Sequence, residues 1–118
     1  MKAVKGIRRV AAKTRSVIEK EIKKLYGISK VRGGVVFTAF YPSASTVCVA
    51  GDFNGWQPKL APMKKIDDKG DWQIKLPLTP GSYRYRFVVD GHWQHDPHNP
   101  DTEPNPYGEL NSVLKVSK

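Results

Sequence analysis

The sequence predicts an all-β protein, an antiparallel β-sandwich preceded by one basic N-terminal α-helix. Two observations lead to this prediction. From Val35 onward, apolar residues recur at every second position in short runs, and turn-forming residues separate these runs. Before Val35, the apolar spacing is three or four residues, and Lys and Arg fill many of the other positions. We therefore expect a basic amphipathic helix and linker over residues 1–32 and a sandwich over residues 33–118, with Gly33 and Gly34 at the boundary.

The predicted helix covers residues 3–26. Gly27 is a suitable C-terminal stop, and Lys23 and Lys24 lie in the last turn. Such a helix is marginally stable alone in water, so we expect it to need a surface to settle on. The sandwich, a protein partner, an anionic membrane and nucleic acid all remain open as that surface, and a solvated helix that connects or oligomerises is favoured. The thin apolar stripe consists of Val4, Ile7, Ala11, Ile18, Ile22 and Leu25.

The sandwich strands follow from alternation between turns. Several short strands without a helical pattern among them are typical of an antiparallel sandwich. Turns are expected at residues 42–45, 51–55, 78–82 and 90–91, and a Pro-rich loop at 97–106. The expected strands cover residues 35–41, 47–49, 72–76, 83–89, a short stretch around Trp93, and 112–116.

Charge and composition restrict the partners. The 118 residues suit one domain with one core. The net charge of +9 lies entirely in residues 1–32, because residues 33–118 hold nine basic and nine acidic side chains. The sandwich is thus a poor candidate for binding phosphate backbones, so a nucleic-acid partner is not favoured. No apolar run approaches the roughly 18 residues that span a bilayer, so no membrane-spanning segment is expected, and a membrane partner is not favoured either.

Cysteine usage and the N-terminal sequence bear on the compartment. Cys48 is the single cysteine, so an internal disulfide cannot form. The N-terminal residues lack the apolar core of a secretory signal. Together these features favour a reducing, cytoplasmic location.

The three tryptophans divide into two kinds. Trp72 shares a strand face with Ile74 and Leu76, which predicts a core position. Trp56 and Trp93 each follow a turn and have no apolar partner on the same face, so we expect both rings to be half exposed. Half-exposed indoles are either packed rim residues or platforms that stack against a flat apolar ligand face.

Polar residues near the two half-exposed tryptophans favour a ligand site. Arg86 and Asn111 lie on outward strand faces, and Tyr107 lies beside the turn at Gly108. An indole that covers the apolar face of a sugar contributes about 1 kcal/mol, and Arg and Asn can hydrogen-bond to ring hydroxyls. The predicted carbohydrate-binding residues are Trp56, Trp93, Arg86, Asn111 and Tyr107.

Three segments carry a family resemblance. Residues 47–56 read VCVAGDFNGW, residues 83–97 read YRYRFVVDGHWQHDP, and residues 107–116 read YGELNSVLKV. Together they resemble the family 48 carbohydrate-binding modules, which include the glycogen-binding domain of the AMP-activated protein kinase beta subunit and the N-terminal modules of branching and debranching enzymes. The resemblance implies an immunoglobulin-like (early-set) sandwich. It also implies that the partner is an α-1,4-linked glucan, either a polymer such as glycogen or starch or a maltooligosaccharide.

The resemblance also assigns roles to residues. The two stacking tryptophans of the family fall on Trp56 and Trp93, its lysine contact on Arg86, and its sugar-contacting asparagine on Asn111. An aliphatic wedge that enters cyclic sugars falls on Tyr107, which implies either a third stacking surface or an obstruction to a cyclic ligand.

One further position departs from the family pattern. A threonine contact of the family becomes Glu109, so the resemblance does not carry that hydrogen bond over to this chain.

Other chemistry fits the sequence less well. His92 and His95 would point to opposite faces of a strand, and no cysteine or strong carboxylate pair completes a metal shell. Asp90 and Asp96 suit turns better than the facing carboxylates of a glycosidase. We therefore expect no metal, no cofactor and no catalysis. The predicted function is non-catalytic α-1,4-glucan binding that brings the protein or a partner to the polymer. The alternative is an interaction or scaffold module that acts through residues 3–26.

Overall fold

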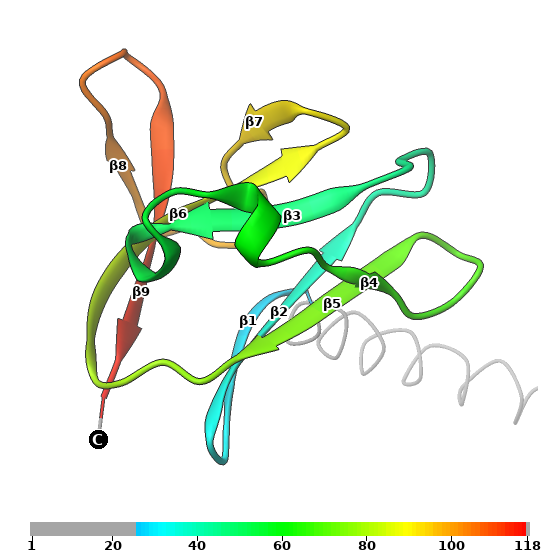
Figure 1. Cartoon of the computed structure of the whole chain (residues 1–118). Helices are drawn as coiled ribbons and strands as arrows, with labels where there is room; N and C mark the ends of the chain where they lie inside the picture. Colours follow the sequence, from blue (N-terminus) through cyan, green and yellow to red (C-terminus); the bar gives the residue numbers. More distant parts are fainter. Residues whose placement is uncertain (1–25, 118) are drawn as a thin grey trace, which may run out of the picture.

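The structure is a computed structural model that describes residues 26–117 as two antiparallel β-sheets (Figure 1). The first sheet has the order β1-β2-β5-β4, and the second has the order β3-β6-β9-β8 with β7 also paired to β6. Except for Tyr26, the predicted helix over residues 3–26 lies outside the described residues, as does the protein partner predicted for it. The strands are β1 (Gly27–Val31), β2 (Gly34–Phe40), β3 (Val47–Gly51), β4 (Lys64–Lys65), β5 (Asp71–Leu76), β6 (Gly81–Val89), β7 (His92–Gln94), β8 (Thr102–Pro104) and β9 (Leu110–Val116).

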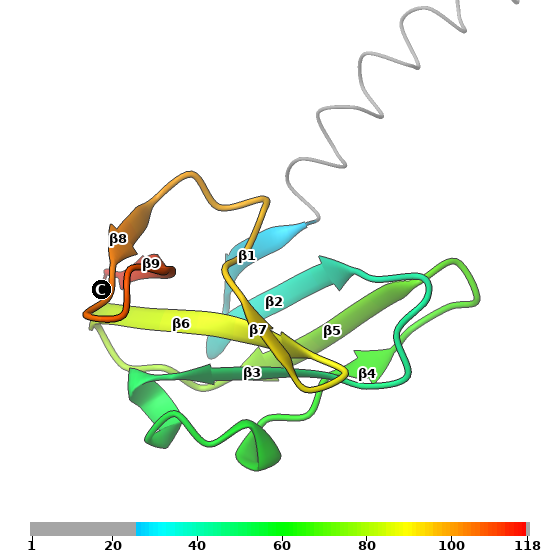
Figure 2. The ribbon, with the colours of Figure 1, turned by 90° about the horizontal axis from the view of Figure 1, so that it is seen from above.

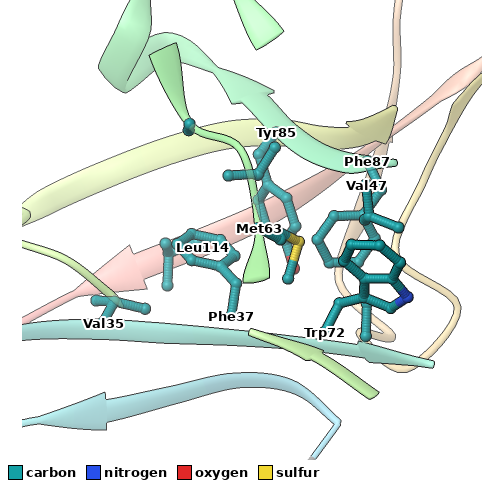
Figure 3. Close-up of a cluster of buried hydrophobic side chains, with 11 residues drawn as sticks. Val35, Phe37, Val47, Met63, Trp72, Tyr85, Phe87 and Leu114 are labelled. Carbon is teal, nitrogen blue, oxygen red and sulfur yellow. The ribbon is translucent and has the colours of Figure 1, made fainter. Parts of the chain in front are cut away.

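The two sheets form layers around one apolar core (Figure 2). Figure 3 shows the core side chains in contact between them, with the Phe37 and Tyr85 rings edge to face at 5.0 Å between centroids. Trp72 is 6% exposed, which confirms its predicted core position. The all-β prediction is confirmed, and the immunoglobulin-like assignment stays a prediction. The buried apolar cluster consists of Val35, Phe37, Ala39, Val47, Val49, Ala61, Met63, Trp72, Tyr85, Phe87 and Leu114.

Strand β1 is a feature that sequence reasoning assigned wrongly. Residues 27–31 were expected to end the helix and link it to the sandwich, but they pair with β2 in the register Gly27↔Thr38 to Val31↔Gly34. Gly33 has φ 82°, a left-handed conformation that suits glycine in the tight turn between β1 and β2. This glycine therefore closes a hairpin of the sandwich rather than marking a boundary before it.

A buried polar network ties the chain between β7 and β8 to the core. Asp96 is fully buried and accepts a hydrogen bond from the Tyr85 hydroxyl at 2.7 Å. The Asp96 backbone N–H donates to Ser112 Oγ at 2.7 Å, and Asn99 Nδ2 donates to the Tyr85 hydroxyl at 3.1 Å. Asp96 does form the predicted turn, because Asn99 N donates to its carbonyl at 3.2 Å. Its burial was not predicted, and it fixes the segment that connects the two hairpins of the second sheet.

Asp96 should make stability fall as the pH rises through the acidic range. Burial raises the pKa of the Asp96 carboxyl, although hydrogen bonds from Tyr85 and the His98 N–H oppose the shift. The folded state then holds this proton more tightly than the unfolded state, so the free energy of unfolding decreases from about pH 4 up to the raised pKa. In Asp96→Asn we expect the free energy of unfolding to lack this decrease with rising pH. Urea unfolding of both proteins at several pH values between 4 and 7 measures the difference.

Asp90 provides a control, because the pKa of its carboxyl is lowered where that of Asp96 is raised. Backbone N–H groups of Thr46 and Ser45 donate to Asp90 Oδ1 at 2.8 Å each and lower the pKa of its carboxyl. Its stabilisation is present above the ordinary carboxyl pKa and is lost as the pH falls, so Asp90→Asn should lower stability by a constant amount above about pH 5, and the difference from the unmodified protein should shrink at lower pH. If the free energy of unfolding of Asp96→Asn varied with pH above pH 4 just as that of the unmodified protein does, the decrease could not be assigned to Asp96.

Candidate functional site

The outward face of the second sheet carries three of the predicted residues. Side chains directly opposite one another in antiparallel strands share a face. Trp93 lies opposite Val88, and Val88 is two residues from Arg86 on the same face of β6. Asn111 lies opposite Glu103 on β8, on the face turned away from the core. The predicted outward orientation of Arg86 and Asn111 is therefore confirmed.

Turns around this face complete a groove. The groove has a volume of about 380 Å³ and includes all five residues that the sequence predicted for the site. β7 and the β8–β9 hairpin rise on the same side of the molecule in Figure 1 and supply two of its walls. The turn after β3 supplies another through Trp56. The lining residues are Asp52, Trp56, Arg84, Arg86, Trp93, Asn105, Pro106, Tyr107 and Asn111.

Trp56 is presented by a tight turn built on Asn54. Asn54 Oδ1 accepts hydrogen bonds from the N–H groups of Gly51 at 3.1 Å and Gln57 at 3.3 Å. Trp56 itself has φ 61°, and its N–H donates to the Gly51 carbonyl at 2.9 Å. A tryptophan with positive φ is uncommon, and such strain gathers at functional sites. The ring is half-buried, as the sequence predicted.

Trp93 is held by the hairpin between β6 and β7. Asp90 and Gly91 have φ 50° and 83°, which is the conformation that Asp-Gly adopts in two-residue hairpin turns. The Trp93 side chain is 41% exposed, which agrees with the predicted half exposure. Its carbonyl accepts a hydrogen bond from Arg86 Nη2 at 3.2 Å. The arginine thus fastens the strand that carries Trp93.

Arg86 and Asn111 form the polar floor of the groove. Each is only 9% exposed, which alternation alone did not predict. Arg86 Nη2 also forms an ion pair with Glu109 Oε2 at 2.6 Å. Within residues 26–117, the buried Arg86 Nε and Asn111 Oδ1 have no hydrogen-bond partner. Each of these two lining residues therefore keeps one polar atom that is unpaired in the described part of the chain, a donor on Arg86 and an acceptor on Asn111.

Tyr107 lies at the tip of the loop between β8 and β9. Asn105 Oδ1 accepts hydrogen bonds from the N–H groups of Tyr107 at 2.9 Å and Glu109 at 3.0 Å. The Asn105 N–H donates to the Glu109 carbonyl at 2.8 Å, which closes the loop. Tyr107 is 88% exposed, so its ring stands beside the groove and is open to solvent.

Sequence reasoning missed Asp52, Arg84, Asn105 and Pro106 in the groove lining. Asp52 falls in the turn expected at residues 51–55, and Asn105 in the Pro-rich loop expected at 97–106, so neither side chain was assigned to a site. Arg84 lies two residues before Arg86, on the same face of β6. This spacing could have identified Arg84 as a residue of the groove. Its Nε lies 3.5 Å from Glu103 Oε1, an exposed ion pair of small energetic value.

The described part of the chain holds neither a metal-binding cluster nor a membrane-spanning helix. Between residues 26 and 117, no three His, Cys, Asp or Glu side chains are grouped in a way that could hold a metal ion. Over the same residues, no helix has the length and apolar character needed to cross a membrane.

Three known proteins are similar in sequence to parts of this chain. A curated relative is the 1,4-alpha-glucan branching enzyme GlgB of Corynebacterium jeikeium, 35% identical over 58% of this chain and 10% of the relative. The protein FLOURY ENDOSPERM 6, chloroplastic, of Oryza sativa is 30% identical over 86% of this chain and 19% of the relative. The protein PTST homolog 2, chloroplastic, of Arabidopsis thaliana is 39% identical over 64% of this chain and 13% of the relative. The chain thus spans 10–19% of the length of these three proteins.

The match to a protein family covers most of the chain. Residues 35–118 match the family described as the glycogen recognition site of AMP-activated protein kinase. This span includes all five predicted site residues and every strand except β1 and the first residue of β2. The chain therefore belongs to the family of glycogen recognition sites of AMP-activated protein kinase, a carbohydrate-binding module of the family 48 type.

Proposed function

We propose that the chain binds α-1,4-linked glucan without catalysis and brings itself, or a protein of which it is part, to glycogen or starch. Trp56 and Trp93 stack against the apolar faces of glucose rings. Arg86 and Asn111 bind ring hydroxyls, and Tyr107 adds a contact at the edge of the groove. The framework that holds them is an immunoglobulin-like sandwich.

The observation that carries the proposal is that two half-exposed indoles line one groove together with Arg86 and Asn111, each of which keeps a polar atom unpaired within residues 26–117. Arg86 Nε and Asn111 Oδ1 are both buried and lack partners among the described residues. A sugar hydroxyl can accept from the first and donate to the second. Glucose also has the apolar faces that indole rings cover.

The expected affinity suits a polymer better than a free sugar. Each indole that covers a sugar face contributes about 1 kcal/mol from apolar burial. Two such contacts and a few hydrogen bonds correspond to a dissociation constant of roughly millimolar to micromolar. On glycogen, neighbouring chains allow rebinding, so several modules or sites raise the avidity far above that of one contact.

The relatives support the same ligand class. One is named for an α-glucan branching reaction, and the family description names glycogen recognition. The chain covers 10% of that branching enzyme, so the proposal includes no part of its catalysis.

Affinity electrophoresis tests the proposal. The unmodified protein should be retarded in gels that contain glycogen or amylopectin and unretarded in gels that contain a β-1,4-linked glucan. Asn111→Ala removes the buried acceptor, so it should weaken retardation by about two- to tenfold. Gln57→Ala is the matched control, because it removes an exposed amide that does not line the groove. Unretarded migration of the unmodified protein in glycogen would reject the proposed function.

A further inference from the structure

Asp52 is an exposed residue of the groove lining that bonds to two other residues of the lining. Its Oδ1 accepts a hydrogen bond from the Trp56 indole Nε1 at 3.1 Å. Its Oδ2 accepts one from the backbone N–H of Arg84 on β6 at 2.8 Å. We infer that Asp52 is a positioning residue that holds the Trp56 indole in the orientation needed for sugar stacking. This inference rests on the proposed function and adds a residue with a distinct role.

The two hydrogen bonds link the ring to the framework. Strand β6 lies in the centre of its sheet and pairs with both β3 and β9, so the Arg84 N–H is a fixed anchor. The Trp56 ring is only half-buried and extends from a turn. Without a restraint at its polar edge, such a ring would sample several rotamers. Asp52 bonds to both the Trp56 indole and the Arg84 backbone N–H. It therefore fixes the position of the indole relative to the sheet that also carries Arg86.

The backbone at Trp56 makes this restraint more important. Its φ of 61° lies in the left-handed region, which a bulky residue rarely occupies. Its N–H bonds to the Gly51 carbonyl at 2.9 Å, so the backbone is held by the turn and the side chain by Asp52. Strain of this kind persists only where surrounding contacts over-determine the conformation. The Asp52 carboxylate is one of these contacts.

The same hydrogen bond defines what Trp56 can offer a ligand. Its indole N–H is already bonded to Asp52, so the ring presents its apolar faces to the groove and not a free donor. Hydrogen bonding to the sugar then falls to Arg86 and Asn111. Fixing the ring before binding lowers the conformational entropy that the complex must lose, which increases affinity without a new contact.

A nuclear magnetic resonance experiment tests the positioning role without any ligand. The Trp56 indole N–H resonance is identified as the one that disappears in Trp56→Phe. In Asp52→Ala we expect this resonance to move upfield and its hydrogen exchange to accelerate, while the Trp72 indole N–H, bonded to the Tyr41 carbonyl at 3.1 Å, stays unchanged. Asp52→Asn keeps one acceptor oxygen and should give an intermediate shift. An unmoved Trp56 indole resonance in Asp52→Ala would overturn the inference.

Binding measurements complete the test. Asp52→Ala should weaken maltoheptaose binding about tenfold, and Asp52→Asn should recover part of the loss. In the Trp56→Phe background there is no indole N–H to hold, so adding Asp52→Ala should have a much smaller effect. Equal effects in both backgrounds would indicate a merely structural role and reject the inference. If the unmodified protein binds no glucan while the indole resonance shifts as expected, the proposed function fails and the link between Asp52 and the ring stands.

Discussion

Trp93→Ala and Trp56→Ala are each expected to abolish retardation of the protein in glycogen gels. Each change removes one of the two indoles that line the groove, and Trp93 and Trp56 come from separate segments that cannot replace one another. The lost stacking and the water admitted to the groove should weaken binding by about tenfold or more per site. Because the expected single-site affinity is modest, this loss should place binding below detection.

The controls separate ring loss from misfolding. Leu60→Ala removes an apolar side chain that is 63% exposed and lies outside the groove lining, so retardation should be unchanged. Thermal unfolding of Trp93→Ala should stay close to that of the unmodified protein, because the ring is 41% exposed. Full retardation of both tryptophan variants would show that the groove is not the binding surface.

Tyr85→Ala is expected to have the largest effect on stability. The residue is fully buried between the sheets, where its ring lies edge to face with Phe37 at 5.0 Å and with Phe87 at 5.8 Å between centroids. Removing a buried aromatic ring costs about 3–5 kcal/mol, because the cavity closes only in part. The hydroxyl also bonds to Asp96 and Asn99, so the segment that joins β7 to β8 loses an anchor. Urea unfolding of the purified variant measures the loss.

Two further variants help to interpret the loss of stability. Tyr85→Phe separates the contribution of the hydroxyl from that of the ring, and Phe40→Ala is the control for an exposed ring. Tyr85→Phe keeps the ring and removes only the hydroxyl, so it leaves the buried Asp96 carboxylate short of one donor and should cost about 1–3 kcal/mol. Phe40→Ala removes a ring that is 44% exposed and should cost clearly less than Tyr85→Ala. A Tyr85→Ala variant as stable as Phe40→Ala would contradict the central place of Tyr85 in the core.

The sequence predicted the core well because alternation directly encodes which strand face is buried. Alternation predicts core positions for Trp72 and for Tyr83, Tyr85 and Phe87; Trp72, Tyr85 and Phe87 are buried, and Tyr83 packs half-buried against the core. The same reasoning separated Trp72 from Trp56 and Trp93, which lie at turns and remain partly exposed. The groove joins all five predicted site residues, although their roles toward a sugar stay predictions.

Other features depend on contacts between distant segments, which a local pattern does not contain. Strand β1 is short and polar, with Lys30 and Ser29 between Ile28 and Val31, and only its pairing with β2 makes it a strand. Arg86 and Asn111 are outward by alternation, yet both are buried within the groove that the turns complete. Alternation gives the direction of a side chain and not what lies above it.

A titration of the unmodified protein with a maltooligosaccharide series, followed by isothermal calorimetry, tests the central claim most directly. Two separate indole platforms should make affinity rise with chain length and then level off once one glucan chain reaches both Trp56 and Trp93. Trp93→Ala should remove this dependence on length. The absence of binding at every length, or binding that Trp56→Ala and Trp93→Ala leave unchanged, would contradict a glucan site in this groove.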